Sequence, residues 1–326
     1  MKSMTIRTLL FAAAGAIGLF QGCQTPTPKE TTPLSEAQLK AFLGHARDAR
    51  TFWITVYQSE NGPIFAGANR LHPEQVARLP FRSASEYTTP IIRLGSLEVF
   101  DAVIDTSSRE NWMDFSTGRD LHATPLAPVC EMKPEHVKDN IPGYISVVSN
   151  LRFDELDVEN AVVCMRGAFG PLGPLSRYPG KSQPECVIGC DMLRSFQVAQ
   201  IDYPARVVVL SSGADYTPDT TNLIATVPLQ EVAGAFAGDG VVDGEPKTVI
   251  IDSAGDFEFA MSNPPTNVLR QVSIGDLVFR KVNVVSLSEL DLGLPNYPRI
   301  GNKLLSRFKV TFAPKRRLVY FERPAP

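Results

Sequence analysis

Two apolar segments of the chain end in an acidic residue that is followed by a hydroxyl residue. The first is Phe100–Ser108 (Phe-Asp-Ala-Val-Ile-Asp-Thr-Ser-Ser) and the second is Thr248–Gly255 (Thr-Val-Ile-Ile-Asp-Ser-Ala-Gly). Each pattern predicts a buried β-strand that ends at an aspartate, Asp105 or Asp252. A carboxylate at the end of a buried strand is costly unless it is hydrogen-bonded, paired or used in chemistry. Because the chain contains this costly feature twice, we predict that Asp105 and Asp252 meet in one site.

A second pair of similar segments lies downstream of these two acids. Ile188–Val198 aligns without a gap with Ile300–Val310, so that Ile, Gly, Leu, Phe and Val coincide. After a one-residue gap, Arg206–Leu210 aligns with Arg317–Phe321. Each copy has the pattern of a strand, a glycine, a short helix and a β-hairpin. The repeat predicts two related β lobes, of which the first is the longer.

The composition agrees with a mostly β globular protein. The 326 residues are 44% hydrophobic and 21% charged, and the 26 prolines favour many loops over long helices. The net charge of −3 and the lack of a basic patch give no reason to expect nucleic acid as a partner. The four histidines are scattered, so a histidine-based metal site is not expected.

The N-terminus has the pattern of a secretion signal. Lys2 and Arg7 form a positive region, and the apolar run Leu9–Phe20 follows. This run is shorter than the roughly 20 residues that a membrane-spanning helix needs. We therefore predict a cleaved signal peptide over residues 1–22.

The end of this signal, Leu19–Cys23 (Leu-Phe-Gln-Gly-Cys), resembles a bacterial lipobox. The resemblance implies that Cys23 is lipidated and becomes the first residue of the mature protein. The alternative is a plain secretory signal with an incidental cysteine. Residues 23–34 are rich in Pro and Thr and predict a linker behind the anchor. We expect a protein of the bacterial cell envelope, tethered to the periplasmic face of a membrane or to the outer membrane.

The two predicted lobes cover residues 35–213 and 214–326. At the start of the first, Ser35 predicts the N-cap of an amphipathic helix that runs to about Arg47, and Thr51–Tyr57 predicts a strand. The apolar face of that helix is formed by Leu39, Phe42 and Leu43.

The two acidic loops resemble those of the aspartic peptidases. In that family, two lobes each provide an apolar-apolar-Asp-Thr/Ser-Gly loop, and further on an apolar-apolar-Gly segment with a short helix. Asp105–Trp112 resembles the pepsin run Asp-Thr-Gly-Ser-Ser-x-x-Trp, and Val242–Asp252 resembles the hairpin before the acidic loop of bacterial retropepsin-like proteins. The resemblance covers residues 90–322. It implies a mostly β, bilobed, pepsin-like fold with two retropepsin-like lobes.

The resemblance also implies a site and an activity. Asp105 and Asp252 would hold one proton between them and activate a water molecule that attacks a peptide bond. Thr106 and Ser253 would bond across the interface between the lobes. The residues that support the aspartates would be Thr106, Ser107, Ser108, Gly189, Ser253, Ala254 and Gly301.

Further features follow from the same resemblance. Tyr144 is the candidate for a flap tyrosine over the substrate cleft, and Trp112 would lie behind it. We expect a monomer that acts on peptide or protein substrates and needs no cofactor and no metal.

The chain departs from the family at two places. Ser107 and Ala254 stand where the family has glycine, and Gly255 follows one residue later. An alternative is therefore a catalytically inactive relative that binds peptides or an envelope partner between the lobes. A third reading, a pair of carboxylates that hydrolyses glycosides, is disfavoured because the flanking pattern repeats as a peptidase loop does.

Four cysteines remain after Cys23, all in the first predicted lobe. They are Cys130, Cys164, Cys186 and Cys190. In an oxidising envelope they could form two disulfides, with three connectivities that the sequence does not separate. The alternative for Cys164, inside an apolar run, is a buried free thiol.

Overall fold

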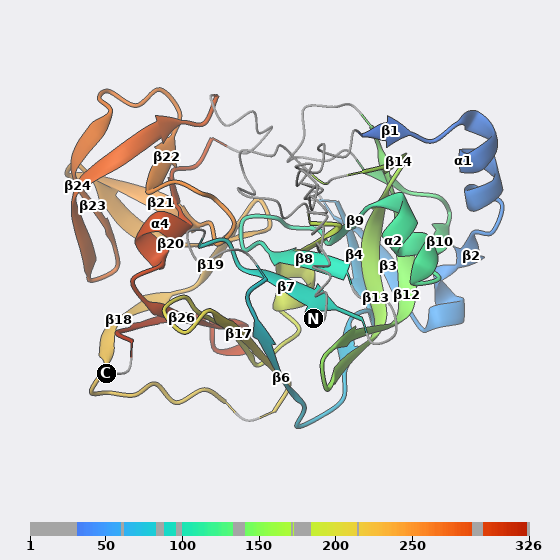
Figure 1. The fold of residues 1–326 in the computed structure, drawn as a ribbon, viewed down its shortest axis with the longest axis horizontal. Coiled ribbons are helices and arrows are strands. Elements are labelled where there is room, and N and C mark those ends of the chain that lie inside the picture. Colours follow the sequence, from blue (N-terminus) through green and yellow to red (C-terminus); the bar gives the residue numbers. More distant parts are fainter. Residues whose placement is uncertain are drawn as a thin grey trace, which may run out of the picture.

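The structure is a computed structural model. It describes residues 31–59, 62–82, 88–95, 100–132, 141–170, 172, 184–213, 215–288 and 296–324. These residues form a mostly β protein with several sheets and a barrel-like arrangement. Strands of the first half of the chain, blue to green, occupy one side of Figure 1, and those of the second half, orange to red, occupy the other.

In the described part of the first half, ten strands form one sheet. Its main path runs through β2 (Arg47–Asp48), β10 (Thr124–Ala127), β12 (Gly143–Phe153), β13 (Leu156–Arg166), β9 (Trp112–Met113), β15 (Cys186–Ile188), β8 (Phe100–Ile104) and β7 (Ile91–Leu94). Off this path, β11 (Glu131–Met132) pairs with β12, and β5 (Arg70–Leu71) pairs with β13.

The second half contains a sheet of seven strands among its described residues. Their order is β19 (Gln230–Val232), β20 (Ala235–Val242), β21 (Glu245–Ile251), β25 (Arg299–Ile300), β22 (Phe259–Met261), β24 (Leu277–Ser286) and β23 (Val268–Ile274). Strands β20 and β21 are joined by the tight turn Asp243–Gly244, in which both residues have positive φ. The hairpin predicted over Val242–Asp252 is therefore confirmed.

The two halves share a six-stranded sheet, which lies along the lower part of Figure 1. Its order is β18 (Leu223–Pro228), β27 (Leu318–Glu322), β26 (Lys309–Ala313), β16 (Val198–Asp202), β17 (Val207–Ser211) and β6 (Val76–Pro80). The halves meet where β16 pairs antiparallel with β26, Gln200 opposite Thr311. Because strands from both predicted lobes pair here, the boundary at residues 213 and 214 remains a prediction about folding units.

The internal repeat is visible in how the strands pair. In the first half β15 runs parallel to β8 and antiparallel to β9, and β9 runs parallel to β13. In the second half β25 runs parallel to β21 and antiparallel to β22, and β22 runs parallel to β24. Each of β15 and β25 is followed by a glycine and a four-residue helix, α3 (Cys190–Leu193) and α4 (Asn302–Leu305). The predicted order of strand, glycine, helix and hairpin is confirmed in both copies.

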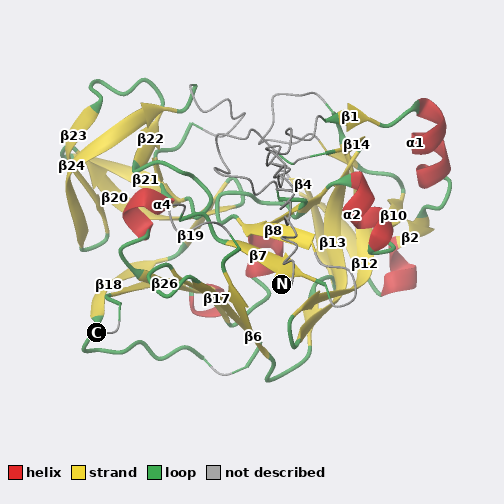
Figure 2. Cartoon of the chain, viewed as in Figure 1, coloured by secondary structure: helices red, strands yellow, loops and turns green. Residues whose placement is uncertain are grey.

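The helices of the described residues are short, and α1 lies on the outer side of the first half (Figure 2). Helix α1 spans Glu36–Leu43, shorter than predicted, because it ends at Gly44. The predicted cap is confirmed: the Ser35 side chain accepts a hydrogen bond from the Gln38 N–H. The predicted strand over Thr51–Tyr57 begins later than expected, as β3 (Thr55–Ser59), which pairs with β4 (Gly62–Ala66). The remaining elements are α2 (Phe115–Asp120), the 3₁₀ turns Ala49–Phe52 and Pro314–Arg316, and the pair β1 (Thr32–Pro33) and β14 (Ala168–Phe169).

The four cysteines beyond the predicted anchor are free thiols, so the expected disulfides are absent from the structure. Strand register explains this for one pair. Ile145 lies between Cys130 and Cys164. Its N–H donates a hydrogen bond to the Cys130 carbonyl, and it stands opposite Cys164 in the next strand. Two strand spacings amount to about 10 Å, whereas a disulfide needs Cα atoms within about 7 Å. The alternative reading of Cys164 holds, and burial raises the pKa of its thiol well above the usual range.

Candidate functional site

Asp105 follows directly after β8 and is held by the loop that it begins. Its N–H donates to the Ile188 carbonyl (3.0 Å), which extends the pairing of β8 with β15 by one residue. Its Oδ1 accepts hydrogen bonds from the Ser107 N–H (2.9 Å) and the Ser107 hydroxyl (2.8 Å). The carboxyl group is thereby fixed at the end of a buried strand, with none of Asp105 exposed.

Asp252 occupies the equivalent place in the second half. Its N–H donates to the Ile300 carbonyl (2.9 Å), extending the pairing of β21 with β25. Its Oδ1 accepts from the N–H groups of Ala254 (3.1 Å) and Gly255 (2.8 Å). Asp252 is also completely buried. Both acids are therefore oriented by donors of their own loop, as a buried carboxylate requires.

The two acidic loops are bonded to each other. The Thr106 N–H donates to Ser253 Oγ (3.0 Å), and the Ser253 N–H donates to Thr106 Oγ1 (3.1 Å). Each hydroxyl also donates across the interface, Ser253 to the Ile104 carbonyl (2.7 Å) and Thr106 to the Ile251 carbonyl. The bonds connect the residues on both sides of Asp105 with those on both sides of Asp252. The predicted contact between Thr106 and Ser253 is confirmed.

The side chains that replace glycine in these loops fit where they stand. Ser107 adds a hydroxyl donor to Asp105, and the Ala254 methyl belongs to an apolar cluster with Val103 and Trp112. Ser108 closes its own loop, because its hydroxyl donates to the Glu110 carbonyl (3.0 Å). The small substitutes therefore preserve loops that present donors to the carboxylates.

Gly189 and Gly301 allow backbone segments to approach these loops closely. A Cβ on Gly189 would lie 2.3 Å from the Glu110 carbonyl oxygen, and one on Gly301 would lie 2.3 Å from the Phe257 carbonyl oxygen. Real Cβ atoms do not approach this close, so both positions need glycine. The supporting role predicted for both residues agrees with this geometry.

Two residues at the site were not predicted. The Arg299 side chain is completely buried, and its Nη1 lies 3.5 Å from Asp252 Oδ2. The Tyr203 hydroxyl donates to the Ser253 carbonyl (3.5 Å). Burial raises the pKa of the Tyr203 phenol well above its usual range, and the charges of Asp252 and Asp105 raise it further. Tyr203 is therefore a neutral neighbour that both aspartates influence.

The sequence contains a signal for one of these two. Arg299 aligns with Val187 in the internal repeat, so a charged residue stands where the first copy has an apolar one. A charge at such a position is unusual for a strand in the middle of a sheet. Tyr203 gives no comparable signal, because its place follows from the shared sheet and not from the repeat.

The structure places the two predicted cleft residues in the interior of the first half. Tyr144 lies opposite Glu131 where β11 pairs with β12, and only 6% of it is exposed. Trp112 lies between Cys164 and Val187 in the sheet and is 3% exposed. The contacts found for both are core contacts, and their assignment to a flap stays a prediction.

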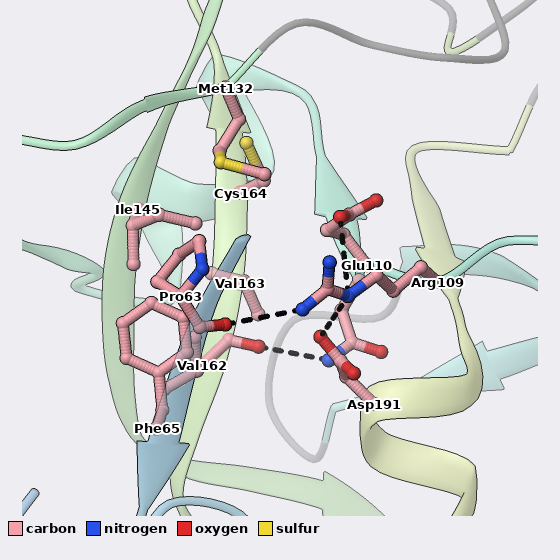
Figure 3. Close-up of a pocket in the computed structure, with 11 residues that line it drawn as sticks. Pro63, Phe65, Arg109, Glu110, Met132, Ile145, Val162, Val163, Cys164 and Asp191 are labelled. Atoms are coloured by element: carbon pink, nitrogen blue, oxygen red, sulfur yellow. Dashed lines mark hydrogen bonds and ion pairs between the residues drawn. The ribbon is translucent and has the colours of Figure 1, made fainter. Parts of the chain in front are cut away.

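A separate, small cavity of about 10 Å³ lies in the first half (Figure 3). Its polar side is formed by Arg109, which lies 3.8 Å from Glu110 and 4.0 Å from Asp191 and donates to the Pro63 carbonyl (3.3 Å). Neither Asp105 nor Asp252 lines this cavity. It is not part of the candidate site.

Neither metal-binding geometry nor similarity to known proteins adds an assignment to this site. Among the described residues, no group of three His, Cys, Asp or Glu side chains is arranged to hold a metal ion. Nor does that part of the chain contain a helix with the length and apolar character needed to cross a membrane. The chain matches no model of a known protein family and no curated protein.

The bonds between the loops lead to a stability prediction. Replacement of Thr106 by valine keeps the shape but leaves the Ser253 N–H without its acceptor and the Ile251 carbonyl without its donor. We expect the free energy of unfolding to fall by about 1–3 kcal/mol, measured by denaturant titration. The matched control is Thr226→Val, at an exposed position of β18, with an expected change within about 0.5 kcal/mol. Equal effects of the two variants would contradict the role of the bonds.

Proposed function

We propose that the protein is an aspartic endopeptidase in which Asp105 and Asp252 hydrolyse peptide bonds, on a bilobed pepsin-like fold. The observation that carries the proposal is the set of hydrogen bonds between the two acidic loops. Loops bonded in this way support a site with one carboxyl group from each half of the chain. The remaining assignments, a monomer that acts on peptides or proteins without a cofactor, belong to the same proposal.

The chemistry follows from two carboxyl groups in one site. Two such groups cannot both ionise cheaply, so one proton is held by the pair. The ionised member takes a proton from a bound water molecule, whose oxygen attacks the peptide carbonyl carbon. The protonated member donates to the carbonyl oxygen as negative charge develops there.

A second candidate is a relative that binds peptides, or an envelope partner, without cleaving them. Two observations favour it: both aspartates are fully buried, and a guanidinium faces Asp252. A peptidase must open its site to a water molecule and a substrate. The inactive candidate needs no such opening at the aspartates.

One assay separates the two candidates. The peptidase is expected to cleave an unfolded protein substrate at acidic to neutral pH, and a pepstatin-type inhibitor should block the cleavage. Absence of cleavage by the wild-type protein over this range would defeat the peptidase proposal. Peptide binding without turnover would favour the inactive relative.

We also propose that Cys23, which lies outside the described residues, anchors the protein in the cell envelope through a lipid. The support is the lipobox-like sequence that ends the signal and the linker behind it. Replacement of Cys23 by alanine is expected to move the protein from the membrane fraction to the soluble fraction. Unchanged fractionation would count against the anchor.

A further inference from the structure

The two halves differ in the strand that supports each aspartate. In the first half, β15 presents the apolar pair Val187 and Ile188 before its glycine, and both are buried. In the second half, β25 consists of Arg299 and Ile300. Ile300 keeps the apolar role, because it belongs to the same core cluster as Ile188. Arg299 therefore makes an otherwise repeated site asymmetric in charge.

The guanidinium of Arg299 lies near Oδ2 of Asp252, whereas the backbone donors of the loop bond to Oδ1. Asp252 Oδ1 accepts from Ala254 and Gly255, whereas Oδ2 lies 3.5 Å from Arg299 Nη1. Both side chains are completely buried. Removing a charged group from water is costly, and an ion pair offsets that cost only when both partners carry their charge. The geometry thus favours a carboxylate at Asp252.

Charged and titratable groups border Asp252 from three elements of the fold. Arg299 faces it from β25, Asp105 belongs to the loop bonded to its own, and Tyr203 lies beyond the end of β16. Tyr203 stays neutral because burial raises its pKa. Asp105 is oriented by two donors of Ser107, both of them uncharged. The position in β15 that matches Arg299 is the uncharged Val187, so a charge distinguishes the two supporting strands.

We propose that Arg299 is a positioning residue that keeps Asp252 ionised, so that Asp252 is the base of the pair and Asp105 carries the proton. This proposal rests on the proposed peptidase function. It assigns the two roles that the internal symmetry alone leaves undecided.

The roles give a balanced reaction. Asp252 removes a proton from water, the water oxygen bonds to the carbonyl carbon, and the carbonyl oxygen takes the proton of Asp105. The resulting diol then collapses: the C–N bond breaks, and the leaving nitrogen takes the proton held by Asp252. One hydroxyl returns its proton to Asp105 as the C=O bond re-forms. A carboxylic acid and an amine leave, and both aspartates regain their initial states.

The test combines Arg299→Met, which removes the charge, with Arg299→Lys, which retains it. Loss of the cation disfavours the ionised form of Asp252, so the acidic side of the pH–activity profile of Arg299→Met should move to higher pH. Arg299→Lys should keep a profile close to that of the wild type. A profile of unchanged shape in Arg299→Met, with only a lower amplitude, would make Arg299 a purely structural residue and overturn the proposal.

A second readout needs no activity. The unfolding midpoint is measured for the wild type, Arg299→Met, Asp252→Asn and the double variant. Arg299→Met should lower the midpoint, and adding Asp252→Asn should restore part of the loss, because the buried carboxylate without its cation is gone. Strictly additive effects would disprove the pair itself. A wild-type protein that cleaves nothing, together with a coupled cycle, would defeat the peptidase function and the catalytic roles while leaving the ion pair intact.

Discussion

Replacement of either Asp105 or Asp252 by asparagine is expected to lower the rate of peptide cleavage by about 10²- to 10⁴-fold. Asparagine has the same shape, and its carbonyl oxygen can still accept the loop hydrogen bonds that hold Oδ1. It can neither take a proton from water nor deliver one to the substrate. The loss should therefore appear in kcat, and Asp252→Asn should also lower the free energy of unfolding, because it leaves the buried Arg299 without its anion.

The matched control for these variants is Asp202→Asn. Asp202 closes a turn by accepting a hydrogen bond from the Ala205 N–H (2.9 Å), a bond that asparagine can also accept. We expect this variant to cleave peptides at the wild-type rate. The double variant Asp105→Asn/Asp252→Asn should lose little more than each single variant, because the two groups act as a unit. Cleavage that persists in either single variant would remove the pair from the mechanism.

The largest expected effect on stability is that of Gly301→Ala. The φ of Gly301 is −98°, which any residue can adopt, so the cost comes from contact and not from backbone strain. The new Cβ would lie 2.3 Å from the Phe257 carbonyl oxygen and 2.8 Å from that of Gly255. Both neighbours belong to the loop that orients Asp252, and backbone atoms cannot rotate away. We expect the free energy of unfolding to fall by about 3 kcal/mol.

A glycine at the end of α1 provides the control for this substitution. Gly44 has a φ of −63°, and a Cβ there would lie 3.2 Å from the Lys40 carbonyl oxygen. Gly44→Ala is expected to change the free energy of unfolding by less than about 1 kcal/mol. Denaturant titration of both variants gives the comparison. If Gly301→Ala is no more destabilising than Gly44→Ala, the result contradicts the close contact between Gly301 and the backbone of the Asp252 loop.

The sequence predicted those parts of the site that the internal repeat encodes. The strand ends at Asp105 and Asp252, the bonds between Thr106 and Ser253, and the glycine before each short helix all follow from matching positions in the two copies. Local patterns of strand, turn and glycine are enough for these features, since each depends on neighbours in the chain. The hydroxyl pair also needed the resemblance to aspartic peptidases.

What the sequence did not reveal depends on contacts between distant segments. The place of Arg299 depends on the parallel pairing of β25 with β21, which brings its side chain to Asp252. Disulfides were predicted because the cysteines are even in number. Strand register instead places Ile145 between Cys130 and Cys164. Tyr144 was assigned by its spacing from Asp105, and spacing does not reveal that a strand pair buries the side chain.

The central claim is that one carboxyl group from each half acts on a single water molecule. It is tested most directly by a crystal structure of the protein with a pepstatin-type inhibitor, whose hydroxyl group takes the place of that water. The account predicts that this hydroxyl lies within about 3 Å of a carboxyl oxygen of Asp105 and of one of Asp252. An inhibitor bound elsewhere, or a separation of the two carboxyl groups too large for one oxygen atom to contact both, would contradict it.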